Sequence, residues 1–212
     1  MTAGKAGRDG VLGLLAPALL WPLRVALQRA ARPLGFAHAL RSADRRLLED
    51  TVLAHHAARP GPLDVLFVGA SADTAAYEDT HFARHRFRTL DIDPAAARHG
   101  SRRQHAVACA SRAAEHFGAE SQDLIVCNGV FGWGLDDPAR IDASLHGFHH
   151  LLRPGGELIV GWNDVPWRRP RGLHEAPALA AFEPVAAPPL GQAVFRVPGS
   201  SRHCFEFFVK PR

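Results

Sequence analysis

A loop that follows an apolar run carries the first residues able to bind a small ligand. The segment DVLFVGASADTAAYEDTHF, Asp64 to Phe82, reaches Gly69 and continues with alanine, serine and aspartate rather than with more glycines. A loop that binds the pyrophosphate of a dinucleotide uses several glycines, because the backbone must approach the phosphates closely at a helix N-terminus. This loop therefore disfavours NAD and the oxidoreductases that use it. It fits a ligand that needs close backbone approach without an anion site.

Polar side chains end several later apolar runs. Asp91 lies 22 residues after Gly69, and Asn128 ends the run DLIVCN. A carboxylate can accept two hydrogen bonds at once, and an amide can orient a reacting group. Because ligands of α/β proteins bind beyond the carboxyl ends of the strands, we expect a wall of a second pocket after the run ELIVGW. The residues of this wall are Asn163, Asp164 and Trp167.

Short apolar runs that alternate with helix-length segments position these residues. The alternation predicts a parallel, doubly wound sheet, so the fold class is α/β. We expect strands at 64–68, 87–91, 105–109, 123–128 and 157–162. We expect helices at 42–58, 73–84, 94–101, 111–117, 139–152 and 175–182. The segment AVFRVPGSSRHCFEFFVK predicts a terminal hairpin of two antiparallel strands.

Four of these segments together carry a family resemblance. The run Asp64–Gly69, RTLDIDP, DLIVCNGVFGWGL and LLRPGGELIVGW follow one another with a spacing that resembles class I S-adenosylmethionine-dependent methyltransferases. The resemblance extends from about Leu63 to the C-terminus, and NGVFGWGL and GWNDVPWRRP are also similar to a bacterial subgroup of methyltransferase-domain proteins. It implies a Rossmann-like fold, with a mostly parallel seven-stranded sheet and a C-terminal antiparallel hairpin, and the residues before it are expected to add an N-terminal helical extension.

The resemblance implies S-adenosylmethionine as the cofactor and gives roles to residues along the first three strands. Asp91 would accept hydrogen bonds from both ribose hydroxyls, and Ile92 would pack on the adenine. Family members place an acid after the third strand to hold the adenine amino group, and Ser111 stands there instead. The cofactor is then expected to meet the loop after the first strand, where a hydroxyl and a carboxylate face its ammonium. The residues of that loop are Gly69, Ala70, Ser71 and Asp73.

The end of the fourth strand is expected to face the transferable methyl group. Asn128, Gly129 and Phe131 stand at this position of the family pattern. Methyl transfer mainly requires positioning, with a base only if the acceptor starts protonated. The candidates for that base are Asp164 and His81. The predicted function is methyl transfer to a small-molecule or saccharide-linked acceptor, and the alternative is a methyltransferase-like scaffold or partner subunit without catalytic activity.

The first part of the chain is expected to form a helical extension, residues 1–60, ahead of a methyltransferase-like domain, residues 61–212. The stretch from Val11 to Leu23 has no charged residue and is too short to span a bilayer as a helix. Three interpretations remain open. The helices pack on the domain, they form a lid or a homodimer contact, or, least favoured, they contact a membrane surface.

Composition excludes several other functions. The net charge of +4 is modest, and the arginines are scattered as well as paired in sequence, without a recognition motif or interleaved aromatic residues, so nucleic-acid binding is not expected. Cys109, Cys127 and Cys204 form no pair or metal-ligand spacing. We therefore expect no metal site, and we expect buried thiols in a protein of the reducing cytoplasm.

Overall fold

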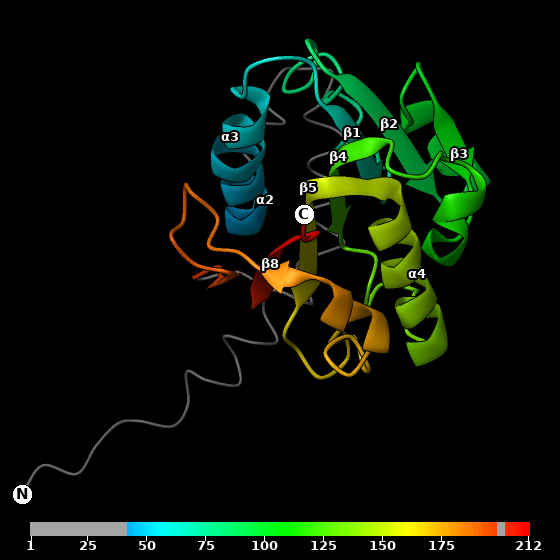
Figure 1. Ribbon diagram of the computed structural model, residues 1–212, viewed down its shortest axis with the longest axis vertical. Helices are drawn as coiled ribbons and strands as arrows, with labels where there is room; N and C mark the ends of the chain where they lie inside the picture. The colour runs from blue at the N-terminus through cyan, green and yellow to red at the C-terminus, as the bar shows by residue number, and fades with distance from the viewer. Residues whose placement is uncertain (1–41, 199–201) are drawn as a thin grey trace, which may run out of the picture.

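The structure is a computed structural model that describes residues 42–198 and 202–212. A central sheet separates two layers, with α2 (Ala43–Leu47) and α3 (Ala54–Ala57) on one side and α4 (Pro138–Leu151) on the other (Figure 1). The predicted α/β class is therefore confirmed. The apolar stretch from Val11 to Leu23 lies outside the described residues. Among the helices that are described, none is both long and apolar enough to cross a bilayer.

Five parallel strands form the greater part of the sheet. Their order in space is β3-β2-β1-β4-β5, so the chain runs outward from β1 to one edge and then returns to build the other half. All five residues of β1 are buried, as expected for a strand covered on both faces. The bounds are β1 Asp64–Val68, β2 Arg86–Asp91, β3 His105–Val107, β4 Gln122–Asn128 and β5 Leu152–Asn163.

The C-terminal strands continue the sheet beyond β5. Strand β8 (His203–Val209) pairs antiparallel with β5 on one side. On its other side it pairs antiparallel with β7 (Val194–Arg196), which confirms the predicted final hairpin, and with a further short strand, β6 (Glu183–Pro184). The described residues thus form eight strands rather than the predicted seven. Because β6 and β7 share one edge of β8, the sheet is still seven strands wide.

The helical segments agree with the sequence in part. The predicted helix 42–58 is present as α2, the π-helical segment η3 (Leu48–Leu53) and α3, and α4 matches the predicted 139–152. The predicted helices 94–101, 111–117 and 175–182 are short 3₁₀ segments, which the structure places at η4 (Pro94–His99), η5 (Ala110–Glu115) and η6 (Pro177–Ala181). Pro94 and Asp93 begin η4, with the Asp93 carboxylate accepting a hydrogen bond from the Ala95 N–H.

The predicted helix 73–84 is wrong, because this segment is a series of turns. Local side-chain hydrogen bonds explain the difference. The Ser71 N–H donates to Thr74 Oγ1 at 2.9 Å, and the Asp73 N–H donates to Ser71 Oγ at 3.2 Å. Such bonds compete with the backbone bonds of a helix.

Two of the predicted strands have bounds that differ from the prediction by two residues or more, and two others by one residue. Strand β3 ends at Val107, two residues earlier than predicted, and β5 begins at Leu152 rather than at 157. The sequence RPGG, residues 153–156, combines a proline with two glycines, which is typical of a turn. It forms a bulge inside β5 instead, because the register with β4 shifts between Gln122 and Leu124.

The core has one apolar cluster on each face of the sheet. The cluster on the α4 side includes Leu66, Val160 and Phe148, and the other includes Phe67, Leu53 and Phe82. The described helix that ends at Ala57 is therefore part of the packed domain. All three cysteines are free and buried, as predicted.

Candidate functional site

The carboxyl ends of β1, β2 and β4 lie together along one side of the sheet, which we call the carboxyl edge, and the opposite side is the amino edge. Gly69 lies where these three strand ends meet. Its φ of 98° is in the left-handed region, and its N–H donates to the Leu90 carbonyl at 2.9 Å. A β-carbon at this position would approach Val130 Cγ2 to 3.0 Å and the Asn128 carbonyl oxygen to 3.2 Å. Glycine is therefore required both by the backbone conformation and by the close approach of the β4 end. This is the position that sequence analysis assigned to the cofactor loop.

Asp91 is the last residue of β2 and lies on the same edge. Its Oδ1 accepts a hydrogen bond from the Asp93 N–H at 2.8 Å, and the carboxylate is partly exposed. The side chain of Ile92, beside it, is 63% exposed. An exposed carboxylate next to an exposed apolar side chain can bind a ligand that has hydroxyls at one end and an apolar ring at the other.

The remaining residues of the predicted cofactor loop are arranged unevenly. Ala70 is buried, Asp73 is exposed, and Ser71 is fixed by its bonds to the following turn. Ser111 lies in η5, where its hydroxyl donates to Cys109 Sγ at 3.1 Å. The Ser111 hydroxyl is thus engaged with its own segment.

Asn128 takes part in a contact that sequence analysis did not predict. Its Oδ1 lies 2.9 Å from Nε2 of His203, the first residue of β8. Because an amide oxygen only accepts, Nε2 carries the proton of the imidazole. Gly161 belongs to β5, which lies between β4 and β8, and a β-carbon at this position would stand only 1.8 Å from Asn128 Oδ1. Glycine at 161 therefore makes room for the Asn128 side chain to cross β5 and reach β8.

The imidazole of His203 is buried, and this determines its charge. Burial lowers the pKa of His203 to about 4, with Asp44 acting to raise it and Arg45 to lower it. The ring is therefore neutral at physiological pH. The pair Asn128–His203 joins residues 75 apart in the chain, and HCFEFFV gives no local sign of it. Only the antiparallel register of β8 on β5 would have located His203 at this edge.

The segment after Asn128 supplies both core and surface. Phe131 is fully buried in the cluster on the α4 side, whereas Gly129 is exposed, with a φ of 68° and open space where a β-carbon would stand. Trp133 is 41% exposed, its Nε1 donates to Asn163 Oδ1 at 2.8 Å, and the Arg168 guanidinium lies 3.9 Å from the ring centroid. The loop after β4 is thus held against the loop after β5.

Asp164 follows β5 and is buried among three arginines. Its Oδ1 accepts from Arg169 Nε at 2.8 Å, and its Oδ2 accepts from Arg196 at 2.6 Å and from Arg202 at 3.1 Å. Burial by itself would raise the pKa of the Asp164 carboxyl, but the hydrogen bonds from Arg169 and Arg196 outweigh it and lower the pKa. An acid held in its ionised form in this way is a weak proton acceptor.

His81 lies in the run of turns after β1. Its Nε2 is 3.0 Å from the Glu49 carbonyl oxygen, and its Nδ1 is 3.0 Å from Thr80 Oγ1. The contact with Glu49 ties this segment to η3. The Tyr77 hydroxyl makes a second connection, because it donates to Glu49 Oε1 at 2.8 Å. His81 thus connects two segments on the side of the sheet opposite α4.

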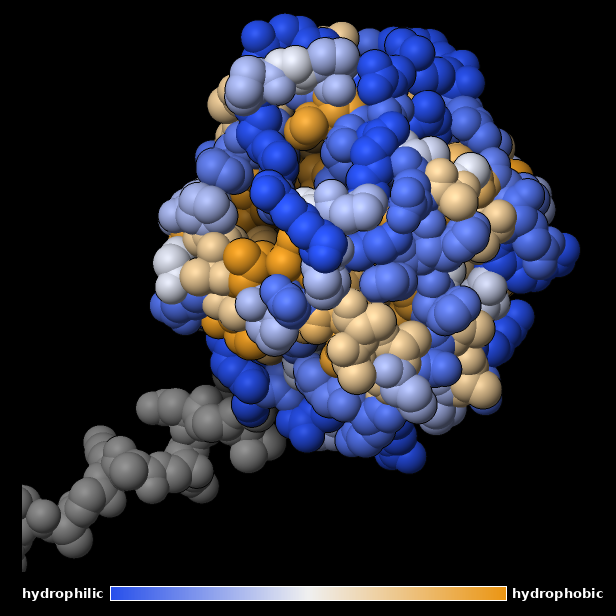
Figure 2. Space-filling model, viewed as in Figure 1, coloured by the Kyte–Doolittle hydropathy of each residue, from blue (hydrophilic) through white to orange (hydrophobic). Residues whose placement is uncertain are grey.

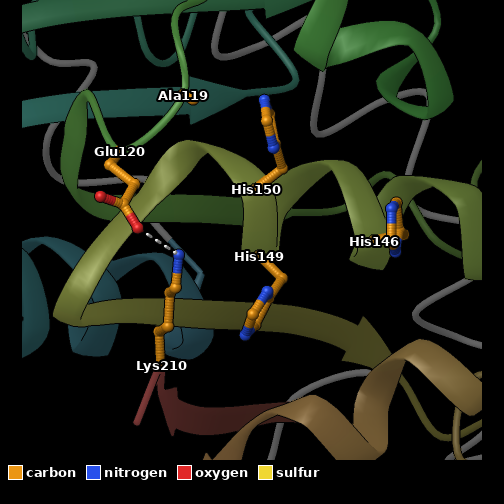
Figure 3. A pocket seen from close by; sticks show the side chains of 6 residues that line it. All are labelled: Ala119, Glu120, His146, His149, His150 and Lys210. Carbon is orange, nitrogen blue, oxygen red and sulfur yellow. Dashed lines mark hydrogen bonds and ion pairs between the residues drawn. The ribbon is translucent and has the colours of Figure 1, made fainter. Parts of the chain in front are cut away.

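The amino edge of the sheet carries a different kind of hollow. A cavity of about 320 Å³ is lined by the end of α4 and by Lys210, which donates to Glu120 Oε1 at 3.2 Å. The rings of His146, His149 and His150 project from α4 in different directions (Figure 3). Among residues 42–198 and 202–212, no group of three or more histidines, cysteines and acids could hold a metal ion. The candidate site lies instead at the carboxyl edge, where Gly69, Asp91 and Asn128 come together.

Comparison with known proteins identifies the fold. No protein-family model matches the sequence, and no curated protein matches it significantly. Solved structures do match. The 1,6-didemethyltoxoflavin-N1-methyltransferase of Burkholderia thailandensis, solved with 1,6-didemethyltoxoflavin and S-adenosylhomocysteine, is 22% identical with a TM-score of 0.55, over 100% of this chain and 94% of that one.

Two further structures are similar to the same extent. The N-methyltransferase NodS of Bradyrhizobium japonicum, in complex with S-adenosylhomocysteine, is 18% identical with a TM-score of 0.56, over 81% of this chain and 94% of that one. A TehB-like S-adenosylmethionine-dependent methyltransferase of Corynebacterium glutamicum is 18% identical with a TM-score of 0.55, over 87% and 98%. The chain has the Rossmann-like fold of class I methyltransferases, as the resemblance implied.

Proposed function

We propose that the protein transfers a methyl group from S-adenosylmethionine to a small-molecule acceptor. The observation that carries the proposal is the convergence of Gly69, Asp91 and Asn128 at one edge of a sheet with the methyltransferase fold. Two of the similar structures contain S-adenosylhomocysteine, the product of methyl transfer from this cofactor.

The residues at this edge fit the cofactor. Asp91 would accept hydrogen bonds from the ribose hydroxyls, because its carboxylate is partly exposed. The Asp93 N–H, bonded to Oδ1, fixes its orientation. Ile92 offers an exposed apolar face for the adenine. Gly69 and the loop from Ala70 to Asp73 allow close backbone approach for the methionyl end. When bound, S-adenosylmethionine supplies an electrophilic methyl group on a sulfonium sulfur.

Asn128 and His203 would position the acceptor. Both lie at the edge beside Gly129, where the space above the backbone is open. His203 holds the Asn128 amide in place through its Nε2 proton, and the neutral ring adds no positive charge that would repel the sulfonium. Two of the similar proteins are N-methyltransferases by name, which favours a nitrogen atom as acceptor, in a free small molecule or on a saccharide.

We assign the two predicted base candidates to positioning rather than to proton transfer. The ion pairs of Asp164 lower its pKa, so its carboxylate organises the loop that follows β5. His81 joins the turns after β1 to the helix that contains Glu49. An acceptor that is already deprotonated needs only orientation in this arrangement.

The test is a crystal structure of the protein with S-adenosylhomocysteine. We expect the ribose hydroxyls within hydrogen-bond distance of the Asp91 carboxylate and the adenine against Ile92. Crystals grown at millimolar ligand that show no ligand at this edge would contradict the proposal. They would favour the alternative of a scaffold without cofactor, to which the engaged hydroxyl of Ser111 already gives some support.

A further inference from the structure

A second pocket, of about 540 Å³, opens on the α4 side of the sheet. Its floor is formed by β5, β8 and the strands beyond β8, and none of its lining residues comes from β1, β2, β3 or β4. Paired residues of antiparallel strands share a face. Val194 therefore stands beside Glu206, and Arg196 beside Cys204, which pairs on its other side with Trp162. The segment after β5 forms the wall, with Arg169, His174 and Leu179.

The end of the pocket nearest the carboxyl edge is positively charged. Arg169 and Arg196 both line it and both bind Asp164, yet their side chains remain 60% and 62% exposed. Arg202 binds the same carboxylate from outside the lining. Three guanidinium groups thus share one carboxylate, and positive charge is left over at this end.

The middle of the pocket contains a buried acid with two hydrogen-bond partners. Glu206 Oε1 accepts a hydrogen bond from Trp162 Nε1 at 2.7 Å and lies 2.9 Å from His174 Nε2. The hydrogen bond to Glu206 raises the pKa of His174, with burial opposing it. Glu206 thus has its hydrogen-bond partners in Trp162 and His174, whereas Arg169 and Arg196 bind Asp164.

The far end of the pocket is apolar. Leu179, Pro184 and Phe208 line it, and Val194 beside them is 44% exposed. In the view of Figure 2 the surface is mostly hydrophilic, and a hydrophobic area lies near the place where Figure 1 labels β8. The pocket therefore runs from a cationic end to an apolar end over the C-terminal part of the sheet.

We propose that this pocket binds an organic anion with an apolar body. The anionic group, a carboxylate or a phosphate, pairs with Arg169 and Arg196. The apolar body lies against Leu179 and Phe208. Guanidinium groups bind such anions through paired hydrogen bonds, and the apolar floor adds the burial that a small ligand needs.

The first experiment is calorimetric titration of the full-length protein, without added cofactor, with 4-phenylbutyrate. The neutral 4-phenylbutanol and the cationic 4-phenylbutylamine share its apolar body and serve as matched ligands. We expect 4-phenylbutyrate to bind at least about tenfold more tightly than the alcohol, and the amine to give no measurable heat. Equal binding of all three, or no binding of the carboxylate, would overturn the proposal.

A pair of variants separates this pocket from general attraction to a basic surface. Arg196→Gln removes a guanidinium that lines the pocket, and Arg202→Gln removes one that is equally exposed and binds the same carboxylate from outside. We expect Arg196→Gln to weaken 4-phenylbutyrate binding at least about fivefold and Arg202→Gln to change it less than about twofold. Equal effects would contradict the assignment.

The apolar end has its own matched pair. Val194→Glu places a negative charge in the pocket, whereas Val107→Glu places one at a similarly exposed valine, 46% against 44%, on the outer strand β3. We expect only Val194→Glu to abolish binding of 4-phenylbutyrate. Because no S-adenosylmethionine is present, failure here would leave the proposed methyl transfer untouched, and failure of that proposal would leave this pocket untouched.

Discussion

Two buried aspartates at opposite edges of the sheet use the same chemistry for different purposes. Asp64 begins β1 and binds Arg86, Arg88 and Arg153, all of which belong to strands. Asp164 follows β5 and also binds three arginines. In its case two lie outside the strands and the third, Arg196, ends the short strand β7. Each carboxylate is no more than 5% exposed.

The difference lies in the arginines. Those around Asp64 are 19% to 39% exposed and join β1, β2 and β5 at the amino edge. Those around Asp164 are 60% to 62% exposed, and two of them line a pocket. A buried carboxylate can thus either join strands, as Asp64 does, or hold exposed arginines beside a pocket, as Asp164 does, and we propose that the second arrangement serves a ligand.

Removing the two carboxylate charges should therefore have unequal effects on stability. Asp64→Asn leaves three arginines close together at the amino edge, and we expect it to lower the free energy of unfolding by about 3 kcal/mol. Asp164→Asn should lower it by about 1 kcal/mol, because its more exposed arginines can turn to water. Urea denaturation followed by circular dichroism measures both. Equal losses would break the comparison.

The two edges should behave alike in their response to acid. Burial lowers the pKa of His56 to about 3 and that of His203 to about 4, against an unfolded value of about 6.5. Below pH 6.5 the unfolded chain binds protons that the folded chain does not bind, so stability falls as the pH falls toward these folded values. We expect each histidine to contribute a loss of about 2 kcal/mol between pH 7 and pH 5.

The measurement is the free energy of unfolding as a function of pH for the wild type, His56→Gln and His203→Gln. Each variant should lose less stability between pH 7 and pH 5 than the wild type. A loss as steep in His203→Gln as in the wild type would show that folding does not lower the pKa of His203. The burial effect on its charge described above would then be wrong.

The smallest expected effect concerns the loops of the carboxyl edge. Arg168→Gln removes the contact of its guanidinium with the Trp133 ring, and we expect a loss of at most about 1 kcal/mol. Arg171→Gln, at an exposed arginine three residues further on, serves as the control. Thermal unfolding should show a midpoint lowered by about 2 to 4 °C for Arg168→Gln alone. A loss of stability close to that of Asp64→Asn would contradict the comparison, because the Arg168–Trp133 contact would then matter as much as the buried ion pairs of the amino edge.

The sequence predicts the elements better than it predicts their partners. The alternation of apolar runs located β1, β4, α4 and the terminal hairpin, and the resemblance located Asp91 and Gly69 at one edge. Local hydrogen bonds of Ser71 and Thr74 replaced a predicted helix, which periodicity does not register.

Long-range pairing was beyond reach. Asp164 was expected to take a proton. Only the fold shows that its carboxylate binds Arg196 and Arg202, which are 32 and 38 residues away in the sequence. His203 was not considered at all, because its position depends on the register between β5 and β8. Residue types thus led to the chemistry proposed for the carboxyl edge, while the packing of the C-terminal strands determines which side chains lie there.

The measurement that tests the central claim most directly is calorimetric titration with S-adenosylmethionine and S-adenosylhomocysteine. We expect dissociation constants of about micromolar magnitude for the wild type, weakened about tenfold or more by Asp91→Asn because the hydroxyl-binding charge is lost. Asp93→Asn, two residues away at the start of η4, should bind like the wild type. No binding of either ligand to the wild type, or equal weakening in both variants, would contradict a methyltransferase site at this edge.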